Sequence, residues 1–270
     1  MEAAVNSPSV SLILPILNRE PRVEEVLRQI MAMMSDSHPD VVLVYDVTRQ
    51  EVLDAVRGEQ ADLELRYGVR CLTRTERRGF GSALRAGYEA SSGDVIIPIM
   101  ADCSDDIPAI PRMLERIAAG ADIVAGARYI SGGAIIGDTP KQQISRAYSK
   151  IARVISSVGC DDVSNSFRAY RRSVWENIDN DATSFDISVE MTVKAAARGY
   201  RLDQVPAIWT NRAAGQSQFS MVKELPNYGR WLLYAARHTP SRALLVATSA
   251  GLISLAVLTV SSVSRARRNR

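Results

Sequence analysis

Short apolar runs alternate along the chain with segments in which apolar residues recur every three or four positions. Runs of the first kind predict buried strands, and segments of the second kind predict amphipathic helices. The predicted strands are Val10–Leu17, Val41–Val44, Val69–Leu72, Val95–Met100, Asp122–Ala125 and Leu202–Trp209. The predicted helices begin near Pro21, Gln50, Gly79, Pro108, Gln142 and Asp186. Short connections between alternating strands and helices predict an α/β fold, a mostly parallel sheet with helices on both faces.

One predicted strand is followed directly by a group of acidic residues. The stretch Ser92–Asp106 reads SGDVIIPIMADCSDD and ends with Asp102, Asp105 and Asp106. Ligands of open α/β sheets bind beyond the carboxyl ends of the strands. Carboxylates gathered there hold a hard divalent cation and, through it, a phosphate. The alternative is an acidic turn that caps the next helix, which begins at Pro108.

A basic segment precedes this strand. Its arginines are Arg74, Arg77, Arg78 and Arg85, against the single acid Glu76. Gly79 and Gly81 let the backbone approach a ligand closely, and a helix N-terminus at this point favours an anion. A dinucleotide fingerprint would need glycine in place of Leu84, so the match to that motif is poor. The alternative is an ordinary helix start with a solvated basic face.

Composition narrows the classes of protein that fit. A chain of 270 residues suits one large domain, or one domain plus an appendage, and 46% hydrophobic residues are ample for a core. The net charge of +3 does not indicate a nucleic-acid partner. Three scattered cysteines predict neither a disulfide framework nor a zinc cluster, and they fit a reducing compartment. The two histidines, His38 and His238, lie near no nucleophile in sequence. The N-terminus lacks the apolar core of a signal peptide.

The C-terminal part has a different character. Ala243–Ser264 carries no charged residue and is followed by several arginines. About 20 apolar residues suffice for a helix to cross a bilayer, so a membrane span is predicted. The alternative is a buried C-terminal helix, or a helix that packs in an oligomer. The preceding segment Met221–His238 predicts a helix in the headgroup layer with Trp231 and Tyr234 at the interface; alternatively, both aromatics pack against the core.

Several sequence blocks occur in an order that is typical of one family. They are LPILNRE (Leu14–Glu20), VVLVYD (Val41–Asp46), RRGFGSALRAGYEASSGD (Arg77–Asp94), MADCSDD (Met100–Asp106), GARYISGG (Gly126–Gly133), DDVSNSFRAYRRS (Asp161–Ser173), FDISVEMTVKAAARGYRLDQVP (Phe185–Pro206) and RAAGQSQF (Arg212–Phe219). From about Val10 to Ala236 the chain resembles the inverting family 2 glycosyltransferases of the GT-A fold. Within that family it is similar to the dolichol-phosphate mannose synthase-like, polyprenyl-phosphate glycosyltransferases.

The resemblance implies a donor site for a GDP-sugar or UDP-sugar with Mg²⁺ or Mn²⁺. The implied donor-binding residues are Pro15, Asn18, Glu20, Asp46, Arg78, Gly79, Gly81, Ala101 and Asp102. The chain departs from the family pattern in several places. Tyr45 stands where the family usually has an acid before Asp46, and Arg19 stands where the family often has Glu directly after Asn. The metal-binding D-x-D falls on Met100-Ala101-Asp102, so Asp102 is the implied ligand, and Asp105 or Asp106 is expected to supply the missing carboxylate.

The resemblance also implies an acceptor side and a catalytic set. The implied acceptor-phosphate residues are Lys141, Ser145, Arg146, Arg168 and Ser217. The implied catalytic residues are Asp102, Arg128, Glu190 and Arg212. Each basic residue has the alternative of a solvated surface arginine or lysine. The alternative for Glu190 is a helix-surface acid that pairs with Lys194.

The function implied is inverting transfer of one mannose- or glucose-type sugar to a polyprenyl or dolichyl monophosphate. The attacking phosphate oxygen is already largely ionised at neutral pH, so no strong general base is required. The expected organisation is a GT-A domain over 1–220, an interfacial helix over 221–240 and a membrane anchor over 241–270, with the catalytic domain on the cytoplasmic face and a homo-oligomer possible. The alternatives are a catalytically impaired sugar-nucleotide-binding subunit, suggested by Met100 and Tyr45, and a transferase that acts on a glycan or protein hydroxyl with Asp186 or Glu190 as base.

Overall fold

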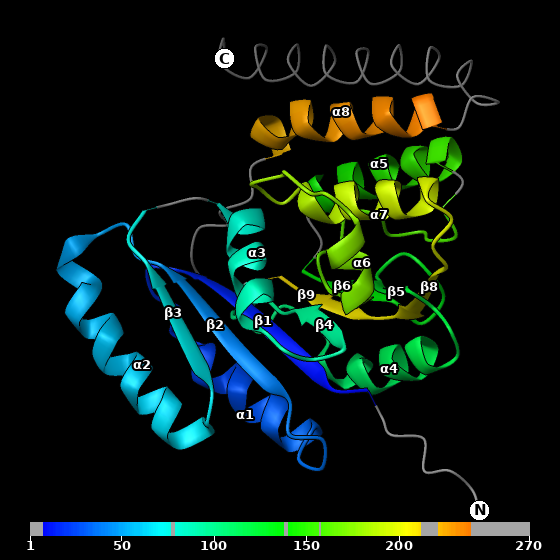
Figure 1. Cartoon of the computed structure of the whole chain (residues 1–270). Coiled ribbons are helices and arrows are strands. Elements are labelled where there is room, and N and C mark those ends of the chain that lie inside the picture. Colours follow the sequence, from blue (N-terminus) through cyan, green and yellow to red (C-terminus); the bar gives the residue numbers. More distant parts are fainter. Residues whose placement is uncertain (1–7, 77–78, 138–139, 157, 212–220, 239–270) are drawn as a thin grey trace, which may run out of the picture.

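A seven-stranded sheet organises the part of the chain that the computed structural model describes, which comprises residues 8–76, 79–137, 140–156, 158–211 and 221–238 (Figure 1). Its strands are β1 (Val10–Leu17), β2 (Asp40–Asp46), β3 (Arg70–Arg74), β4 (Val95–Pro98), β5 (Ile123–Ala127), β7 (Arg168–Arg171) and β8 (Leu202–Pro206). The strand order is β3-β2-β1-β4-β7-β5-β8. Only β7 runs antiparallel to its neighbours in this sheet. The predicted mostly parallel sheet is therefore confirmed, and the carboxyl ends of its parallel strands share one edge.

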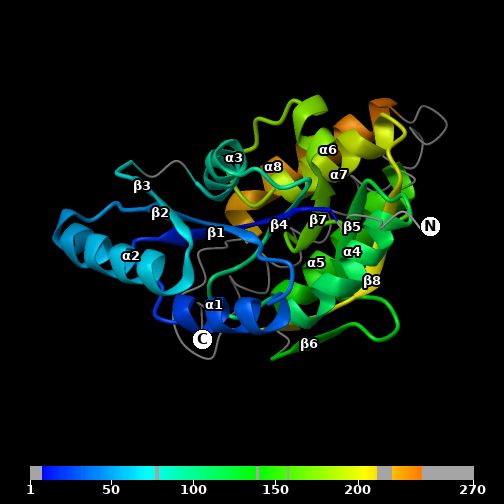
Figure 2. The ribbon, with the colours of Figure 1, turned by 60° about the horizontal axis from the view of Figure 1, so that its bottom comes forward.

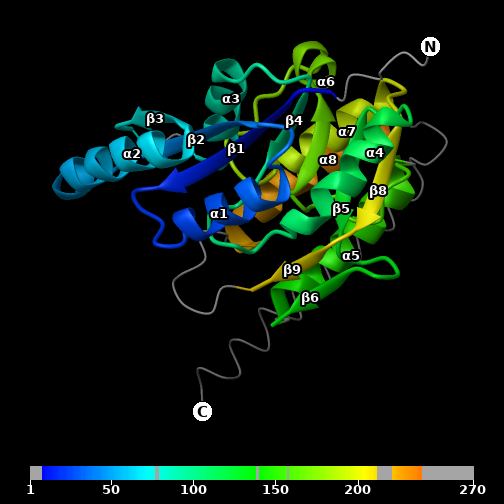
Figure 3. The same cartoon turned by 90° about the horizontal axis from the view of Figure 1, so that it is seen from below.

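Helices cover both faces of the sheet (Figures 2 and 3). They are α1 (Val23–Met33), α2 (Leu53–Tyr67), α3 (Phe80–Ala90), α4 (Ile110–Ala118), α5 (Pro140–Ser156), α6 (Arg172–Asn177), α7 (Ile187–Ala197) and α8 (Met221–His238), with short 3₁₀ turns at Gln50–Val52 and Ile107–Ala109. Buried residues of α1, α2 and α4 form one core cluster with the sheet, and those of α3, α5, α6, α7 and α8 form the other. The molecule thus has three layers, as predicted.

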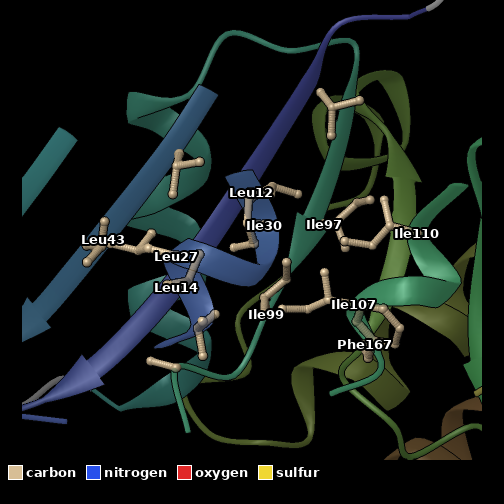
Figure 4. Packing of buried hydrophobic residues seen from close by; sticks show 14 of the residues in the cluster. Leu12, Leu14, Leu27, Ile30, Leu43, Ile97, Ile99, Ile107, Ile110 and Phe167 are labelled. Atoms are coloured by element: carbon tan, nitrogen blue, oxygen red, sulfur yellow. The ribbon is translucent and has the colours of Figure 1, made fainter. Parts of the chain in front are cut away.

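The strand β1 is apolar on both faces because it lies inside the sheet. Leu12 and Leu14 pack with Leu27 and Ile30 of α1 in the first cluster (Figure 4). Ile13, the residue between the two leucines, belongs to the cluster on the opposite face. Successive side chains of a strand point to opposite faces, so a strand covered on both sides reads as a nearly continuous apolar run, which in β1 only Ser11 interrupts.

The helix α3 approaches β1 closely at Gly87. A Cβ atom at this position would lie 2.4 Å from Cγ2 of Ile13 and 3.1 Å from Cγ2 of Val44. We expect Gly87→Ala to lower the free energy of unfolding by about 1–3 kcal/mol, because the added methyl group overpacks the core. The matched control is Gly58→Ala on α2, where nothing lies within 4 Å and alanine should be neutral or stabilising. Urea unfolding of both variants measures the difference, and equal effects would contradict the packing described.

The structure differs from the sequence prediction at several elements, among them β6 (Ala134–Ile136) and α6, which were not predicted. β7 was not predicted, and the predicted strand Leu202–Trp209 is divided at Ala207 into β8 and β9 (Ile208–Thr210). β9 leaves the main sheet and pairs with β6 (Ala134–Ile136) in a two-stranded ribbon. The helix predicted to begin near Gln50 and to end at Val56 continues as α2 to Tyr67. The buried stripe of α2 continues to Leu63, but it contains the polar residue Gln60, which interrupts the apolar periodicity after the first turn.

The helix α8 forms where the sequence predicts it, but its aromatic residues are placed differently. Trp231 is 5% exposed, and its Nε1 donates a hydrogen bond of 2.9 Å to Oδ2 of Asp186. This burial corrects the prediction that Trp231 lies in a headgroup layer, since the side chain packs against α7 instead. Within the described ranges, no helix is both long enough and apolar enough to cross a membrane. The predicted span Ala243–Ser264 lies outside these ranges.

Candidate functional site

Polar residues gather at the edge where the parallel strands end. Asn18 follows β1, Asp46 ends β2 and Arg74 ends β3. The strand register pairs Leu17 with Asp46, and Asp46 with Arg74. The acidic loop after β4 and Arg128 after β5 lie at the same edge, because β4 and β5 run in the same direction as β1. Residues from five strands therefore contribute to one site.

Asn18 connects the backbone at the ends of β1 and β2. Its Oδ1 accepts hydrogen bonds from the backbone N–H groups of Thr48 and Arg49, at 2.8 and 3.2 Å. Its own backbone N–H donates to the carbonyl oxygen of Asp46 at 2.8 Å. The backbone of Asn18 has a φ of 57°, a left-handed conformation that asparagine tolerates better than most residues. Asn18 thus joins the ends of β1 and β2 rather than projecting its amide oxygen toward solvent.

Asp46 and Arg74 form an ion pair at the donor side. Asp46 is 5% exposed, and Nε of Arg74 lies 2.6 Å from its Oδ1. Nη1 of Arg74 also donates to the carbonyl oxygen and hydroxyl of Ser82 in α3, at 2.8 and 3.0 Å. Arg74 therefore connects the end of β2 to the first turn of α3. It was noted in the basic segment of the sequence, but it was not assigned to the donor site.

Gly79 and Gly81 make close approaches to the protein's own backbone. A Cβ atom at Gly79 would lie 2.2 Å from the carbonyl oxygen of Thr183, and one at Gly81 would lie 2.3 Å from that of Ala182. The N–H of Gly81 donates to the Thr183 carbonyl at 3.0 Å. The segment 182–184 thus requires that both positions lack a side chain, with or without a bound ligand. Arg78 lies outside the described residues.

Glu190 holds the beginning of the same segment through hydrogen bonds to its backbone. Its carboxylate is fully buried and accepts hydrogen bonds from the N–H groups of Asp181 and Ala182 and from Nζ of Lys194, the last at 2.5 Å. Burial raises the pKa of Glu190, and the hydrogen bonds from Lys194 and the backbone oppose that rise. The predicted pairing with Lys194 exists, but in the interior instead of on a helix surface. Glu190 therefore acts on the site through the backbone that abuts Gly79 and Gly81.

The three acidic residues after β4 point in different directions. Oδ1 of Asp102 accepts hydrogen bonds from the N–H and hydroxyl of Ser104, at 3.1 and 2.6 Å. Oδ2 of Asp105 accepts from the N–H of Met100 at 2.8 Å, which turns its carboxylate back into the loop. Oδ2 of Asp106 instead accepts from the N–H of Ile208 at 3.0 Å and fastens β9. Asp105 therefore shares the loop with Asp102, and Asp106 serves the neighbouring ribbon.

Asp105 has a buried carboxylate oxygen without a hydrogen bond and a raised pKa, and a bound cation would stabilise its charged form. Its Oδ1 is buried and accepts no hydrogen bond. Burial is the main reason that the pKa of Asp105 is raised, to about 7, and the charges of Asp102 and Asp106 add to the rise. No group of three or more His, Cys, Asp or Glu side chains suited to a metal occurs among the described residues. Two carboxylates nevertheless fit Mg²⁺, which takes its other ligands from substrate phosphates and water.

The raised pKa of Asp105 predicts a dependence of stability on pH. The folded chain keeps the Asp105 proton up to about pH 7, whereas the unfolded chain releases it near pH 3.8. The free energy of unfolding should therefore fall as pH rises through this window, by about 1.4 kcal/mol per unit at most. Asp105→Asn should remove this fall, and Asp106→Asn should retain it. Urea unfolding between pH 4.5 and 7 with a chelator tests the prediction, and equal slopes in wild type and Asp105→Asn would contradict it.

A buried ion pair lies on the acceptor side. The guanidinium of Arg128 donates to both carboxylate oxygens of Asp162, at 2.7 and 2.8 Å, and the exposed fractions of the two residues are 9% and 0%. Burial alone would raise the pKa of Asp162, but the charge and hydrogen bonds of Arg128 lower it. Nη2 of Arg128 also lies 3.4 Å from the hydroxyl of Ser145 and 3.3 Å from that of Ser164. The charge of Arg128 reaches Asp105 as well, where it opposes the rise in pKa.

Tyr129 connects this pair to α5. The ring centroid of Tyr129 lies 5.0 Å from the guanidinium carbons of both Arg128 and Arg146. Its hydroxyl donates to Ser145 at 3.0 Å. Arg146 is exposed, so it lies at the outer rim of the site, whereas Ser145 faces inward. The predicted residues Arg128, Ser145 and Arg146 are therefore brought together.

Arg168 is not part of this group of accessible acceptor-side residues. It is fully buried in β7, where Nε donates to the carbonyl oxygen of Asn165 at 2.7 Å and Nη2 donates to that of Asp162. These contacts correct the expectation that Arg168 meets an acceptor phosphate, because its donors serve the backbone that carries Asp162. The sequence block that contains Asp162 and Ser164 was recognised, but neither residue was assigned a role.

The remaining predicted residues are only partly placed. Pro15 lies in β1 and is half-buried, Glu20 follows β1 and accepts a hydrogen bond from the N–H of Arg22 at 3.2 Å, and Ala101 is buried in the acidic loop. Lys141 belongs to the first turn of α5, and its side chain is outside the described part. Arg212 and Ser217 lie outside the described residues.

Comparisons with known proteins agree with this geometry. The family described as glycosyl transferase family 2 matches residues 11–179. The chain is 30% identical to an undecaprenyl-phosphate mannosyltransferase of Micrococcus luteus, over 87% of this chain and 98% of the relative. It is 28% identical to a dolichol-phosphate mannosyltransferase of Pyrococcus furiosus, over 77% of this chain, and it spans 58% of that relative's length.

A solved structure shows the fold. Glucosyl-3-phosphoglycerate synthase from Mycobacterium tuberculosis, in complex with Mn²⁺, uridine diphosphate and glucosyl-3-phosphoglycerate, superposes with a TM-score of 0.61 at 17% identity, covering 86% of this chain and 80% of that one. The fold is accordingly a GT-A-like α/β fold with a mostly parallel sheet. The family match extends from β1 past β7 and includes the acidic loop, Arg128 and Asp162. The chain belongs to glycosyl transferase family 2.

Proposed function

We propose that this chain transfers one mannose- or glucose-type sugar from a nucleotide-diphosphate sugar to a polyprenyl monophosphate, with inversion at the anomeric carbon. The observation that carries the proposal is that the carboxylates of Asp102 and Asp105 lie at the same sheet edge as the buried Arg128, whose charge opposes the rise in the pKa of Asp105. The named activities of the Micrococcus and Pyrococcus relatives support this acceptor class.

The donor side is built from the ends of β1 to β4. The base and ribose would lie against Pro15, Asn18, Glu20 and Asp46. The diphosphate would lie near the N-terminus of α3, where helix geometry favours an anion. Asp102 and Asp105 would hold Mg²⁺ or Mn²⁺, which supplies positive charge to the departing diphosphate. A thermal-shift screen of GDP, UDP and their sugars with Mn²⁺ distinguishes the two candidate bases.

The acceptor side needs no strong base. A phosphate monoester with a second pKa near 6 is largely ionised at neutral pH, so its oxygen attacks the anomeric carbon without losing a proton there. The bond from that carbon to the diphosphate oxygen breaks, and the diphosphate leaves on the opposite face. Arg128, Ser145 and Arg146 supply donors toward the acceptor phosphate, and we place Arg212, Ser217 and Lys141 with them. Neither described histidine is involved, since His38 precedes β2 and His238 ends α8.

The organisation proposed for the whole chain keeps the transferase domain at a membrane surface. Residues 1–220 form the GT-A domain, and 241–270 form the anchor that places it on the cytoplasmic face. The helix α8 over Met221–His238 packs on α5 and α7 of this domain (Figure 1).

Acceptor comparison tests the proposal against its alternatives. The full chain is incubated with labelled nucleotide sugars, Mn²⁺ and one of three acceptors: a polyprenyl phosphate, the matching polyprenol, and a glycan or protein hydroxyl acceptor. Label that enters only the polyprenyl phosphate, in a mild-acid-labile product, is expected. Label in the hydroxyl acceptors would favour the glycan or protein transferase. Binding of donor without transfer to any acceptor would favour the catalytically impaired subunit.

A further inference from the structure

The helix α5 carries positive charge without compensating acids of its own. Its sequence, PKQQISRAYSKIARVIS, contains no aspartate or glutamate. Arg146, Lys150 and Arg153 are exposed on its outer side. Arg153 is paired with Asp161, outside the helix, and keeps a side-chain exposure of 51%. An exposed helix of a soluble domain usually mixes both signs of charge, so this face attracts an anionic partner.

The same outer side also exposes apolar residues. Ile144 is 43% exposed and Val154 is 45% exposed. Gln143, Ala147, Lys150 and Val154 are all exposed and are spaced i, i+4, i+7 and i+11, so they form one stripe along the helix. Apolar side chains interleaved with basic ones on one exposed stripe are typical of helices that lie on a lipid surface.

The inner side of α5 belongs to the proposed acceptor site. The hydroxyl of Ser145 lies 2.7 Å from that of Ser164, and that of Ser149 lies 3.4 Å from it. The hydroxyl of Tyr148 donates to the carbonyl oxygen of Tyr228 in α8 at 3.0 Å, which fixes the helix from behind. One face of α5 thus lines the proposed acceptor site, and the opposite face is exposed.

We infer that the outer face of α5, comprising Gln143, Ala147, Lys150 and Val154 with Ile144 at its margin, docks on an anionic lipid headgroup surface. This inference rests on the proposed function, because a polyprenyl phosphate presents its phosphate at headgroup depth. A helix that lines the site on one side and rests on headgroups on the other holds Arg128 and Ser145 within one helix diameter, roughly 10 Å, of that depth. The charge of one sign favours a lipid surface over a second copy of this chain, whose matching face would repel it. Trp231 of α8 is buried, so that side chain does not provide this contact.

Site-specific photo-crosslinking tests the contact without requiring activity. A benzophenone amino acid is placed at Ala147 or Val154 of the full chain, and at Leu65 on α2, which is 86% exposed, as control. With vesicles that contain anionic phospholipid, lipid adducts should form at 147 and 154 at least tenfold more often than at 65. Equal yields at all three positions would overturn the inference, as would protein–protein adducts at 147 and 154 in place of lipid adducts. If the lipid-adduct yields at 147 and 154 were the same with purely zwitterionic vesicles as with anionic vesicles, the proposed electrostatic attraction to anionic lipid would be overturned.

Charge reversal tests the same contact in the reaction. Each basic residue near an anionic surface strengthens binding roughly fivefold, so Lys150→Glu should reduce lipid crosslinking at 154 by roughly tenfold or more. Transfer to an acceptor embedded in anionic vesicles should fall, while transfer to a water-soluble short-chain polyprenyl phosphate should stay unchanged. Arg57→Glu on α2, whose side chain is 66% exposed, is the matched control. Loss of transfer to the short-chain acceptor as well, or no loss in vesicles, would overturn the inference. A chain that crosslinks to lipid but transfers to no acceptor would instead contradict the proposed function alone.

Discussion

Arg128→Ala should lower the free energy of unfolding by about 3–5 kcal/mol, because it leaves the fully buried carboxylate of Asp162 without its counter-ion. The carboxylate would also lose hydrogen bonds from Nε and Nη2 of Arg128, and the Ser145 and Ser164 hydroxyls would lose a neighbouring donor. Urea unfolding of the full chain measures the loss. The expected loss of unfolding free energy is large because Asp162 is fully buried, so water cannot replace the interactions that its carboxylate loses.

Two further variants make this result specific. Asp162→Ala in the Arg128→Ala background should cost less than the sum of the two single changes, since the second change removes the uncompensated charge. Arg116→Ala breaks a surface pair with Asp203 at 3.7 Å, in which Arg116 is 57% exposed, and should cost less than about 1 kcal/mol. A loss for Arg128→Ala that matches the Arg116→Ala loss would refute the account of the acceptor side.

Asp102→Asn should reduce kcat/KM for sugar transfer by about 10²- to 10³-fold. The change keeps an oxygen that can accept the hydrogen bonds from Ser104, but it removes the negative charge proposed to hold the cation at the diphosphate. Transfer is measured at several Mn²⁺ concentrations, and the unfolding midpoint is measured in parallel to show that the fold is retained.

The matched control for this variant is Asp106→Asn. Asp106 lies in the same loop, but its carboxylate binds the N–H of Ile208 and lies 4.0 Å from Arg112. Its effect on transfer should stay within about threefold. Equal losses for both variants would show that loop structure, and not metal binding by Asp102, explains the result.

The sequence predicted elements whose pattern is set by burial on both faces. The bounds of β1 were predicted as observed, because an apolar run of 8 residues is short enough for a buried strand and too short for a typical buried helix. β7 was missed because it is a short strand with arginine at both ends, RAYR. Arg168 is nevertheless fully buried, since backbone carbonyl oxygens accept its hydrogen bonds. Such compensation comes from the tertiary structure and leaves no mark in a local pattern.

The site was predictable as a set of motifs but not as a geometry. The motif order indicated an acidic loop and a basic acceptor side, and the structure places Asp102, Asp105 and Arg128 at one edge. The sequence left open whether Asp105 or Asp106 accompanies Asp102, because both are adjacent acids. The structure separates them, because Asp105 accepts a hydrogen bond from the N–H of Met100 within the loop and Asp106 accepts one from the N–H of Ile208 in β9. Asp162 was overlooked because the partner of a buried arginine can come from any part of the chain.

The most direct test of the central claim is transfer by the purified full chain in detergent, with labelled nucleotide sugar, Mn²⁺ and a polyprenyl monophosphate. The product is isolated, and the configuration at its anomeric carbon is determined by NMR. Formation of a mild-acid-labile lipid with the sugar β-linked to phosphate, from an α-linked donor, is the predicted result. An α-linked product, or label found only as free sugar or in hydroxyl-linked products, would contradict the claim.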